Sequence, residues 1–262
     1  MTDISYHIFS PGKTAENTAA AALSELIATE ESDVAWSRMI RHRLAGHAAA
    51  GCTDRYYIAL DGSKCVSRLW CGWGKHADAI GNWGHFRTAE IMQGRGIGRR
   101  LLDCWFEHQQ SSTDNPAAFL CSCGKPFLVE LYGRYGFRLA LKNTEVGPLY
   151  CPWRNSPGTF QEFCEEYYTD CDELTFLPGK TEYRHEVDCL LYFALREQGE
   201  QFGLPGMASY EEALMLLESS PDAGQLERIA ISNGHTVGWA FTPQGGKRQV
   251  QLHPKYRRCQ LC

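Results

Sequence analysis

The sequence predicts an α/β (α+β) fold, because segments with the pattern of strands alternate with segments that have the pattern of helices. The stretch Gly84–Leu102 begins as a strand and ends as an amphipathic helix, with a glycine-rich corner between the two. The apolar run Ala117–Cys123 has the length of a strand, and the short helical segment after it ends at Gly136. With 262 residues, 44% of them apolar, the chain can form one large or two small globular domains.

Five further elements are expected before the glycine-rich corner. Asp3–Ser10 has the pattern of a strand, and Pro11–Thr29 that of a turn followed by an alanine-rich helix. A second helix is expected over about Val34–Ala50, where apolar residues recur at helical spacing. Arg55–Asp61 and Lys64–Trp73 flank a glycine turn and therefore predict a hairpin.

The rest of the chain is expected to contain a loop, a linker and a second domain. Gly74–Trp83 has the composition of a loop, and the Pro- and Ser-containing stretch Pro152–Pro157 is the best linker candidate. We therefore expect one domain over residues 1–154 and another over residues 155–262. A helix is expected near Thr159–Tyr168, and short antiparallel hairpins over Arg228–Phe241 and Gln249–His253.

The corner Gln93–Gly98 is expected to bind an anion. Gly94, Gly96 and Gly98 remove side chains where backbone N–H groups converge, and the dipole of the following helix adds partial positive charge. Three arginines add formal charge: Arg95, Arg99 and Arg100. A phosphate or pyrophosphate group is the natural ligand, and a tight turn without any ligand is the alternative.

Spacing separates three kinds of glycine-rich corner. The dinucleotide pattern G-x-G-x-x-G would need glycine where the chain has Arg99, and a P-loop would need a lysine after Gly98. The third pattern, Q/R-x-x-G-x-G/A between a strand and a helix, is matched by Gln93, Gly96 and Gly98. This pattern resembles the acyl-CoA pyrophosphate loop of the GNAT (GCN5-related N-acetyltransferase) superfamily.

A second motif agrees with this resemblance. In Pro126–Phe137, Tyr132 lies four residues before the pair Gly136-Phe137, which is similar to the second GNAT signature. The order strand, glycine corner, helix, strand, helix, Gly-Phe pair, strand also matches that family. The resemblance implies the GNAT fold, a mixed and mostly antiparallel sheet flanked by helices.

The resemblance implies direct transfer of an acetyl or other acyl group from acyl-CoA to a primary amine of a small molecule. Acetyl-CoA is the implied co-substrate. Its pantetheine arm would bond to the backbone of Phe86, Arg87 and Thr88. The corner would hold its pyrophosphate through Gln93, Gly94, Arg95, Gly96, Ile97, Gly98 and Arg99.

The resemblance assigns Tyr132 as the general acid that protonates the leaving CoA thiolate. The general base is less well defined, because Trp83–Arg87 contains no glutamate, and His85 is the nearest titratable group. Lys125 also departs from the family, which commonly has asparagine at this position. A regulatory protein that binds acyl-CoA without turnover, and a protein N-acetyltransferase, are the alternative functions.

Composition limits the other functions. The net charge of −5 argues against bulk nucleic-acid binding, which favours a basic face. No apolar run reaches ~18 residues and the N-terminus lacks the pattern of a signal peptide, so we expect a cytoplasmic protein with no membrane partner. The 12 cysteines are expected to stay reduced. No metal is expected, because Cys259 and Cys262 near His253 fall short of four zinc ligands.

Two stretches of the first domain recur in the second. Phe9-Ser-Pro-Gly-Lys-Thr recurs from Phe176, and Ile58-Ala-Leu-Asp-Gly recurs from Ile229 with one insertion. Residues from Glu173 to about Pro254 thus resemble a second, degenerate GNAT half that lacks the glycine corner and should not bind CoA. Its last strand is expected to be covered by the first domain, by the helix near Thr159–Tyr168, or by another subunit in a homodimer.

Overall fold

The computed structural model describes residues 3–11, 18–30, 40–170, 173–200, 224–243 and 246–259. The chain forms two compact units. The N-terminal unit contains residues 1–75 and 81–115, and the C-terminal unit contains residues 76–80 and 116–262. The linker expected at Pro152–Pro157 lies within the C-terminal unit, and the two predicted domains stay a prediction.

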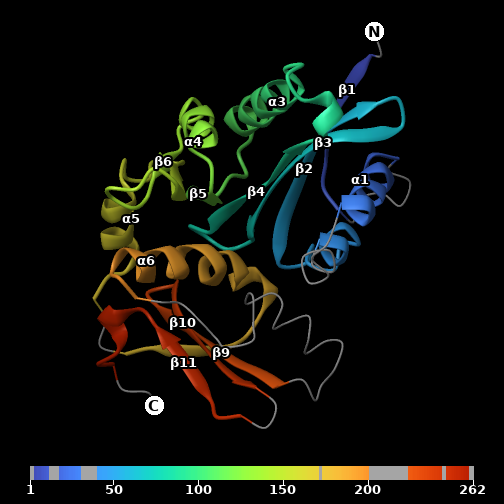
Figure 1. The fold of residues 1–262 in the computed structure, drawn as a ribbon. Helices are drawn as coiled ribbons and strands as arrows, with labels where there is room; N and C mark the ends of the chain where they lie inside the picture. Colours follow the sequence, from blue (N-terminus) through green and yellow to red (C-terminus); the bar gives the residue numbers. More distant parts are fainter. Residues whose placement is uncertain are drawn as a thin grey trace. The chain divides into compact units, whose positions relative to one another are not determined.

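The N-terminal unit is built on four antiparallel strands in the order β1-β2-β3-β4 (Figure 1). Its elements are β1 (Ile4–Phe9), α1 (Thr18–Glu30), β2 (Cys52–Asp61), β3 (Lys64–Gly74), β4 (Ile80–Thr88), the 3-10 turn η1 (Glu90–Met92) and α3 (Ile97–Ser111). The first strand, the described part of the first helix, and the hairpin agree with the predictions. β4 starts at Ile80, so the expected loop Gly74–Trp83 is too long. Gly81 and Trp83 already pair with β3 there.

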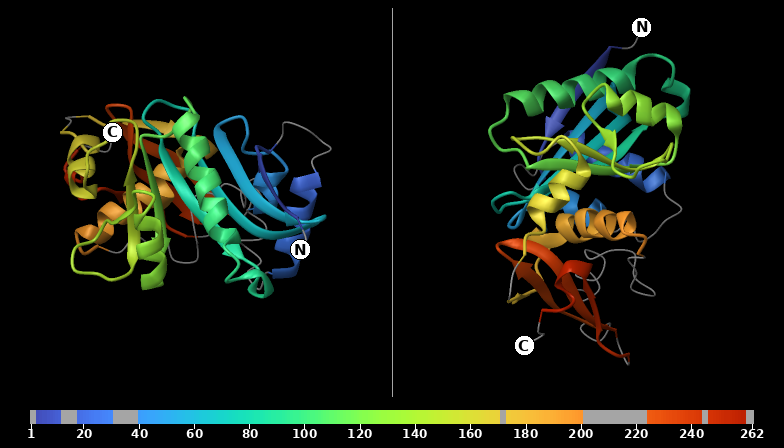
Figure 2. Two further views of the ribbon diagram at one scale, coloured as in Figure 1. Left: turned by 90° about the horizontal axis from the view of Figure 1, so that it is seen from above. Right: turned by 90° about the vertical axis from the view of Figure 1, so that its left-hand side faces the viewer.

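Alternation along β2 places its side chains on two faces, and each face carries one helix. Tyr56, Ile58 and Leu60 pack in one cluster with Leu23 and Ile27 of α1. On the other face, Ala59 packs with Ile97 at the start of α3. α1 and α3 therefore cover opposite faces of this sheet, as the two views of Figure 2 show.

The helix predicted over Val34–Ala50 is shorter than expected at its C-terminal end. Residues 31–39 lie outside the described residues, and the helical conformation ends after Leu44. Gly46 adopts a φ of 84°, and its N–H donates to Arg43 O, which closes the last turn. Arg43 is buried at this end, where it bonds to Asp54 at 2.5 Å.

The C-terminal unit contains two sets of antiparallel strands, in the order β5-β7-β6 and, as a four-stranded sheet, β11-β10-β9-β8. Its strands are β5 (Ala118–Cys123), β6 (Arg138–Leu139), β7 (Gly147–Pro152), β8 (Thr175–Pro178), β9 (Gly224–Ser232), β10 (His235–Pro243) and β11 (Gln249–Leu252). Its helices are α4 (Pro126–Gly133), α5 (Phe160–Tyr167), the 3-10 turn η2 (Thr181–Tyr183), the π-helix η3 (Glu186–Leu191), α6 (Tyr192–Glu197) and the 3-10 turn η5 (Pro254–Tyr256).

One hydrophobic core joins both sheets of the C-terminal unit. Leu120 and Tyr150 of the first sheet and Ala230 and Leu252 of the second belong to the same cluster of buried side chains. Phe163 of α5 belongs to it too, and α5 confirms the helix predicted near this position. A capping box between Thr159 and Glu162 fixes its start, because each side chain bonds to the other residue's backbone N–H.

The segment between β3 and β4 is bonded to Glu186, which lies 110 residues after His76 in the chain. His76 Nε2 and the backbone N–H of Ile80 both bond to Glu186 Oε1, at 2.9 and 3.0 Å. Glu186 is the first residue of the π-helix η3 and is buried. These bonds explain why residues 76–80 belong to the C-terminal unit although β3 and most of β4 do not.

The sheet β8-β9-β10-β11 has the same strand order as the strands β1-β2-β3-β4 of the N-terminal unit, but its strands pair in a different register. β8-β9-β10-β11 are joined as β1-β2-β3-β4 are. Phe9 pairs with Tyr56 in the N-terminal unit, whereas Phe176 pairs with Ala230, the counterpart of Ala59 in the sequence repeat. The degenerate second GNAT half therefore stays a prediction. The predicted fold class, α/β with a mostly antiparallel sheet flanked by helices, is confirmed.

Candidate functional site

The predicted corner lies in the N-terminal unit, between η1 and α3. Gly94 and Gly96 adopt φ angles of 74° and 77°, in the left-handed region that costs an ordinary side chain about 1–2 kcal/mol. A Cβ atom at either glycine would have no neighbour within 4 Å. The backbone at these two positions therefore has a left-handed conformation and leaves space for a ligand.

Gly98 serves a different purpose, the close approach of α3 to β4. A Cβ atom here would lie 2.9 Å from Thr88 Oγ1 and 3.1 Å from Phe86 Cζ, closer than real contacts allow. Ser67 Oγ bonds to Thr88 Oγ1 at 2.9 Å and to Arg87 O at 3.1 Å, which fixes the end of β4. In the sequence, the only signal of Ser67 is its place in an alternating strand.

The N-terminus of α3 presents backbone donors without a side-chain cap. The first described helical bond runs from Arg100 N to Gly96 O, so the N–H groups of Ile97, Gly98 and Arg99 precede the hydrogen-bond ladder. Gln93 does not cap them, because its Nε2 donates to Thr88 O at 3.0 Å. This end of the helix can therefore donate to an anion.

The three arginines differ in their partners. Arg100 lies 3.7 Å from Glu107 in an exposed ion pair. The exposed Arg95 and Arg99 form no ion pair or hydrogen bond with another residue in the part of the chain that the structure describes. Two exposed cations thus stand next to the N–H groups at the start of α3 and add to the positive potential there.

β4 contains a bulge at the candidate base. Arg68 pairs with Arg87 and Trp70 with Gly84, so His85 and Phe86 together oppose one residue of β3. His85 has a φ of 57°, and its ring lies 4.9 Å from the Trp70 ring, which packs in the cluster on the α1 face. Phe86 contacts the α3 side instead. His85 is thus held on the face opposite α3.

Tyr132, the candidate general acid, belongs to the C-terminal unit. It lies near the end of α4 with 5% of its surface exposed. Burial raises the pKa of its phenol well above the ordinary value, and the nearby Cys121 and Cys123 raise it further. Its phenol therefore keeps its proton at neutral pH.

The Gly-Phe pair closes the turn after α4. Gly136 has a φ of 94°, and a Cβ atom there would lie 3.3 Å from Cys151 Sγ. The N–H of Phe137 donates to Tyr132 O at 3.3 Å, so the pair fixes the C-terminal end of α4. Lys125 is the N-cap of α4, but its side chain makes no capping bond.

No metal-binding cluster of three or more His, Cys, Asp or Glu side chains occurs among the described residues. Cys262 lies outside those residues. Cys259 packs against the hydrophobic core, and His253 stacks on Tyr168 with ring centroids 4.0 Å apart. None of the described helices is long and apolar enough to cross a membrane.

No protein-family model and no curated protein sequence matches the chain. The chain does resemble solved structures, and these include GNAT acetyltransferases. One is a GNAT family N-acetyltransferase from Escherichia coli in complex with CoA, with 16% identity and a TM-score of 0.42 over 58% of this chain and 82% of that one. Another is an acyl-CoA N-acyltransferase from Pseudomonas aeruginosa, with 16% identity and a TM-score of 0.41 over 57% and 99%. A third is a GNAT family acetyltransferase from Staphylococcus aureus, with 13% identity and a TM-score of 0.40 over 57% and 100%.

Proposed function

We propose that this protein is an acyl-CoA-dependent N-acyltransferase that transfers an acetyl or other acyl group directly to a primary amine of a small molecule. The observation that carries the proposal is the uncapped N-terminus of α3 beside the left-handed Gly94 and Gly96. Such an end binds phosphate groups, because several backbone donors and the helix dipole act on one anion.

The pyrophosphate of acyl-CoA would bind the N–H groups of Gly94–Arg99, with Arg95 and Arg99 neutralising its charge. Charge-assisted hydrogen bonds contribute ~1.5–3 kcal/mol each, so a few of them support micromolar affinity after the cost of association. The pantetheine arm would follow the backbone of Phe86, Arg87 and Thr88. The bond from Ser67 Oγ to Arg87 O holds this stretch in place.

The reaction itself needs three proton transfers: the ammonium loses one proton before it attacks, the nitrogen loses a second as the amide forms, and the CoA thiolate gains one. The amine nitrogen attacks the thioester carbonyl carbon, the C–S bond breaks, and CoA leaves as a thiolate. Tyr132 would protonate that thiolate, for which its retained phenolic proton is suited. Before the attack, the alkyl ammonium, which has a pKa of ~10 and is charged at neutral pH, would lose one proton to His85, directly or through water. As the amide forms, the nitrogen would lose a second proton, which would return through water to the phenolate of Tyr132.

The test is to measure acetyl-CoA binding by isothermal titration calorimetry and turnover by thiol release with a panel of small primary amines. We expect micromolar binding and amine-dependent thiol release. Binding without release for any amine would favour the acyl-CoA-binding regulatory protein instead. Absence of acetyl-CoA binding would contradict both functions.

A further inference from the structure

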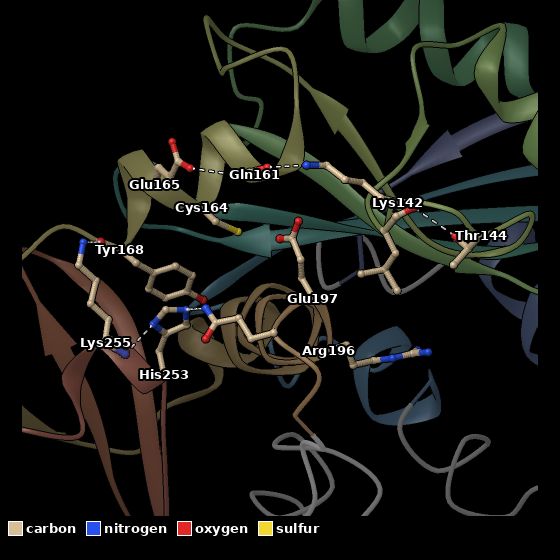
Figure 3. Close-up of a pocket in the computed structure, with 12 residues that line it drawn as sticks. Lys142, Thr144, Gln161, Cys164, Glu165, Tyr168, Arg196, Glu197, His253 and Lys255 are labelled. Carbon is tan, nitrogen blue, oxygen red and sulfur yellow. Dashed lines mark hydrogen bonds between the residues drawn. The ribbon is translucent and has the colours of Figure 1, made fainter.

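A cavity in the C-terminal unit lies where α5 and α6 end. It has a volume of about 830 Å³, within the usual range for small-molecule sites. Its walls come from the turn after β6, from α5, from the end of α6 and from the residues after β11. Twelve side chains line it, and Figure 3 draws them: Leu141, Lys142, Thr144, Gln161, Cys164, Glu165, Tyr168, Arg196, Glu197, Gln198, His253 and Lys255.

We propose that this cavity, called here the α5–α6 pocket, is a binding site for a small organic cation, with the carboxylate of Glu197 as the group that binds its ammonium. Glu197 is the last residue of α6, and its carboxylate points into the pocket toward Cys164 (Figure 3). This site does not depend on acyl transfer, so it can be tested without CoA.

Glu197 lacks the hydrogen bonds or ion pairs to other described residues that normally stabilise a half-buried carboxylate. No hydrogen bond or ion pair joins it to another residue in the described ranges. Burial raises the pKa of Glu197, Lys142 lowers it and Glu165 raises it again. A carboxylate that loses water without gaining a partner is destabilised, and an ammonium group from a ligand would remove that penalty.

The cations around the pocket already have other partners. Lys142 Nζ donates to Gln161 Oε1 at 3.0 Å. Lys255 Nζ donates to Tyr168 O at 2.7 Å and lies 3.0 Å from Asp170 Oδ1. Arg196 lies over the Tyr192 ring at 5.4 Å from its centroid, and Figure 3 shows it pointing away from Glu197.

Helix ends make the same side of the pocket negative. α5 ends at Tyr167 and α6 at Glu197, so the partial negative charges of two helix C-termini meet there. At the end of α5, Lys255 supplies a positive charge by bonding to Tyr168 O. At the end of α6, Leu195 O and Arg196 O accept bonds from the N–H groups of Glu200 and Gly199.

A second buried polar group lacks a partner beside the pocket. Tyr168 is 2% exposed, and its hydroxyl makes no hydrogen bond in the described structure. Its ring stacks on His253, whose Nε2 lies 3.0 Å from Gln198 Nε2. Figure 3 shows the hydroxyl of Tyr168 directed toward the side of the pocket where Glu197 stands. The two rings offer an apolar wall for the body of the ligand.

Benzylammonium is a suitable probe, and benzyl alcohol is its neutral counterpart of similar shape. We expect saturable binding of benzylammonium to the full chain in a two-dimensional amide NMR titration, with the backbone signals of Cys164 and Gln198 among those that shift. Benzyl alcohol should not saturate the site. Glu197→Gln should weaken benzylammonium about tenfold or more, because a charge-assisted bond is lost.

Two variants sharpen the test. Glu166→Gln also removes one negative charge, but Glu166 is on α5 and does not line this pocket. The affinity of this variant for benzylammonium should therefore match that of the parent chain. Lys142→Met removes a like charge and should strengthen binding. Absence of saturable binding, or equal loss in Glu197→Gln and Glu166→Gln, would overturn the proposal. Since Glu197 makes no bond to another described residue, its variant should keep the native amide spectrum.

Discussion

At the scale of single residues, the glycines of the corner are required for two different reasons, although they belong to one sequence pattern. Gly94 and Gly96 have left-handed backbones with open space around them, whereas Gly98 faces β4 with no space at all. Substitution at the first two should therefore affect the ligand, and substitution at the third should affect the fold.

Gly96→Glu is expected to abolish acetyl-CoA binding, because the side chain fills the anion site and opposes the charge of the pyrophosphate. Gly62→Glu is the matched control. Gly62 also has a positive φ, 60°, and no neighbour within 4 Å of an added Cβ, but it lies in the β2–β3 turn. Calorimetry should show lost affinity only for Gly96→Glu, and equal affinity in both variants would remove the anion site.

Gly98→Ala is expected to destabilise the protein by about 1–3 kcal/mol, because a methyl group overpacks the contact with Thr88 and Phe86. Gly133→Ala has open space and should not destabilise by this mechanism. Urea denaturation of both variants measures the difference. A Gly98→Ala protein as stable as the parent chain would show that α3 can move away from β4 at little cost.

Tyr132→Phe is expected to lower kcat about 100-fold while acetyl-CoA affinity stays nearly constant, as for a lost general acid. Tyr150→Phe is the control, because it removes another buried phenol that donates to Pro157 O at 2.7 Å. That variant should lose stability but keep kcat. Equal rates for Tyr132→Phe and the parent chain would assign Tyr132 to packing alone.

At the scale of elements, the bonds from Glu186 to the β3–β4 segment couple a loop to a π-helix. Burial lowers the pKa of His76, but the hydrogen bond and charge of Glu186 outweigh it, and the net pKa is raised. A raised native pKa means that the folded protein binds a proton more tightly than the unfolded chain does. The interaction therefore stabilises the fold below the unfolded pKa of ~6.5.

This stabilisation should disappear as pH rises through the raised pKa of His76. The free energy of unfolding of the parent chain should thus fall relative to His76→Gln as pH increases from about 6.5. Chemical denaturation at several pH values measures this difference. His7→Gln is the control, since His7 lies in β1 and its side chain bonds only to Ser5 in the described structure. A constant difference across this range would contradict the coupling.

At the scale of the whole molecule, the shared core of the C-terminal unit predicts that a fragment without the last part of the chain is unstable. Leu120 and Tyr150 pack with residues that follow the predicted linker, including Phe163. A fragment ending at Asn155 should therefore expose apolar surface and aggregate, as size-exclusion chromatography would show. Co-expression of residues 156–262 should restore its solubility. A soluble, monodisperse fragment with native acetyl-CoA affinity would contradict this account.

Sequence reasoning succeeded where a structure depends on residues close together in the chain. The β2–β3 hairpin, the glycine corner and the helix started by Thr159 and Glu162 follow from local spacing. It failed where distant residues decide. The bulge at His85 depends on pairing with β3 and has no signal in composition. The end of the second predicted helix at Gly46 is local, but helical periodicity alone did not indicate it.

The candidate sites divide in the same way. The proposed anion site comes from one continuous stretch, so its glycines could be suggested from the sequence. The α5–α6 pocket combines Lys142, Cys164, Glu197 and His253 from four separate segments. No spacing rule brings these residues together, since only the tertiary packing of the C-terminal unit does so.

The segment that Glu186 holds also affects the order of events during synthesis. Glu186 is 110 positions after His76, and at ~5–20 residues per second the ribosome needs about 5–20 s to produce the residues between them. During that interval the link from β3 to β4 has emerged without the carboxylate that bonds to it. A nascent chain stalled before residue 186 should therefore be cut by protease at residues 76–80, and one stalled well beyond it should be protected.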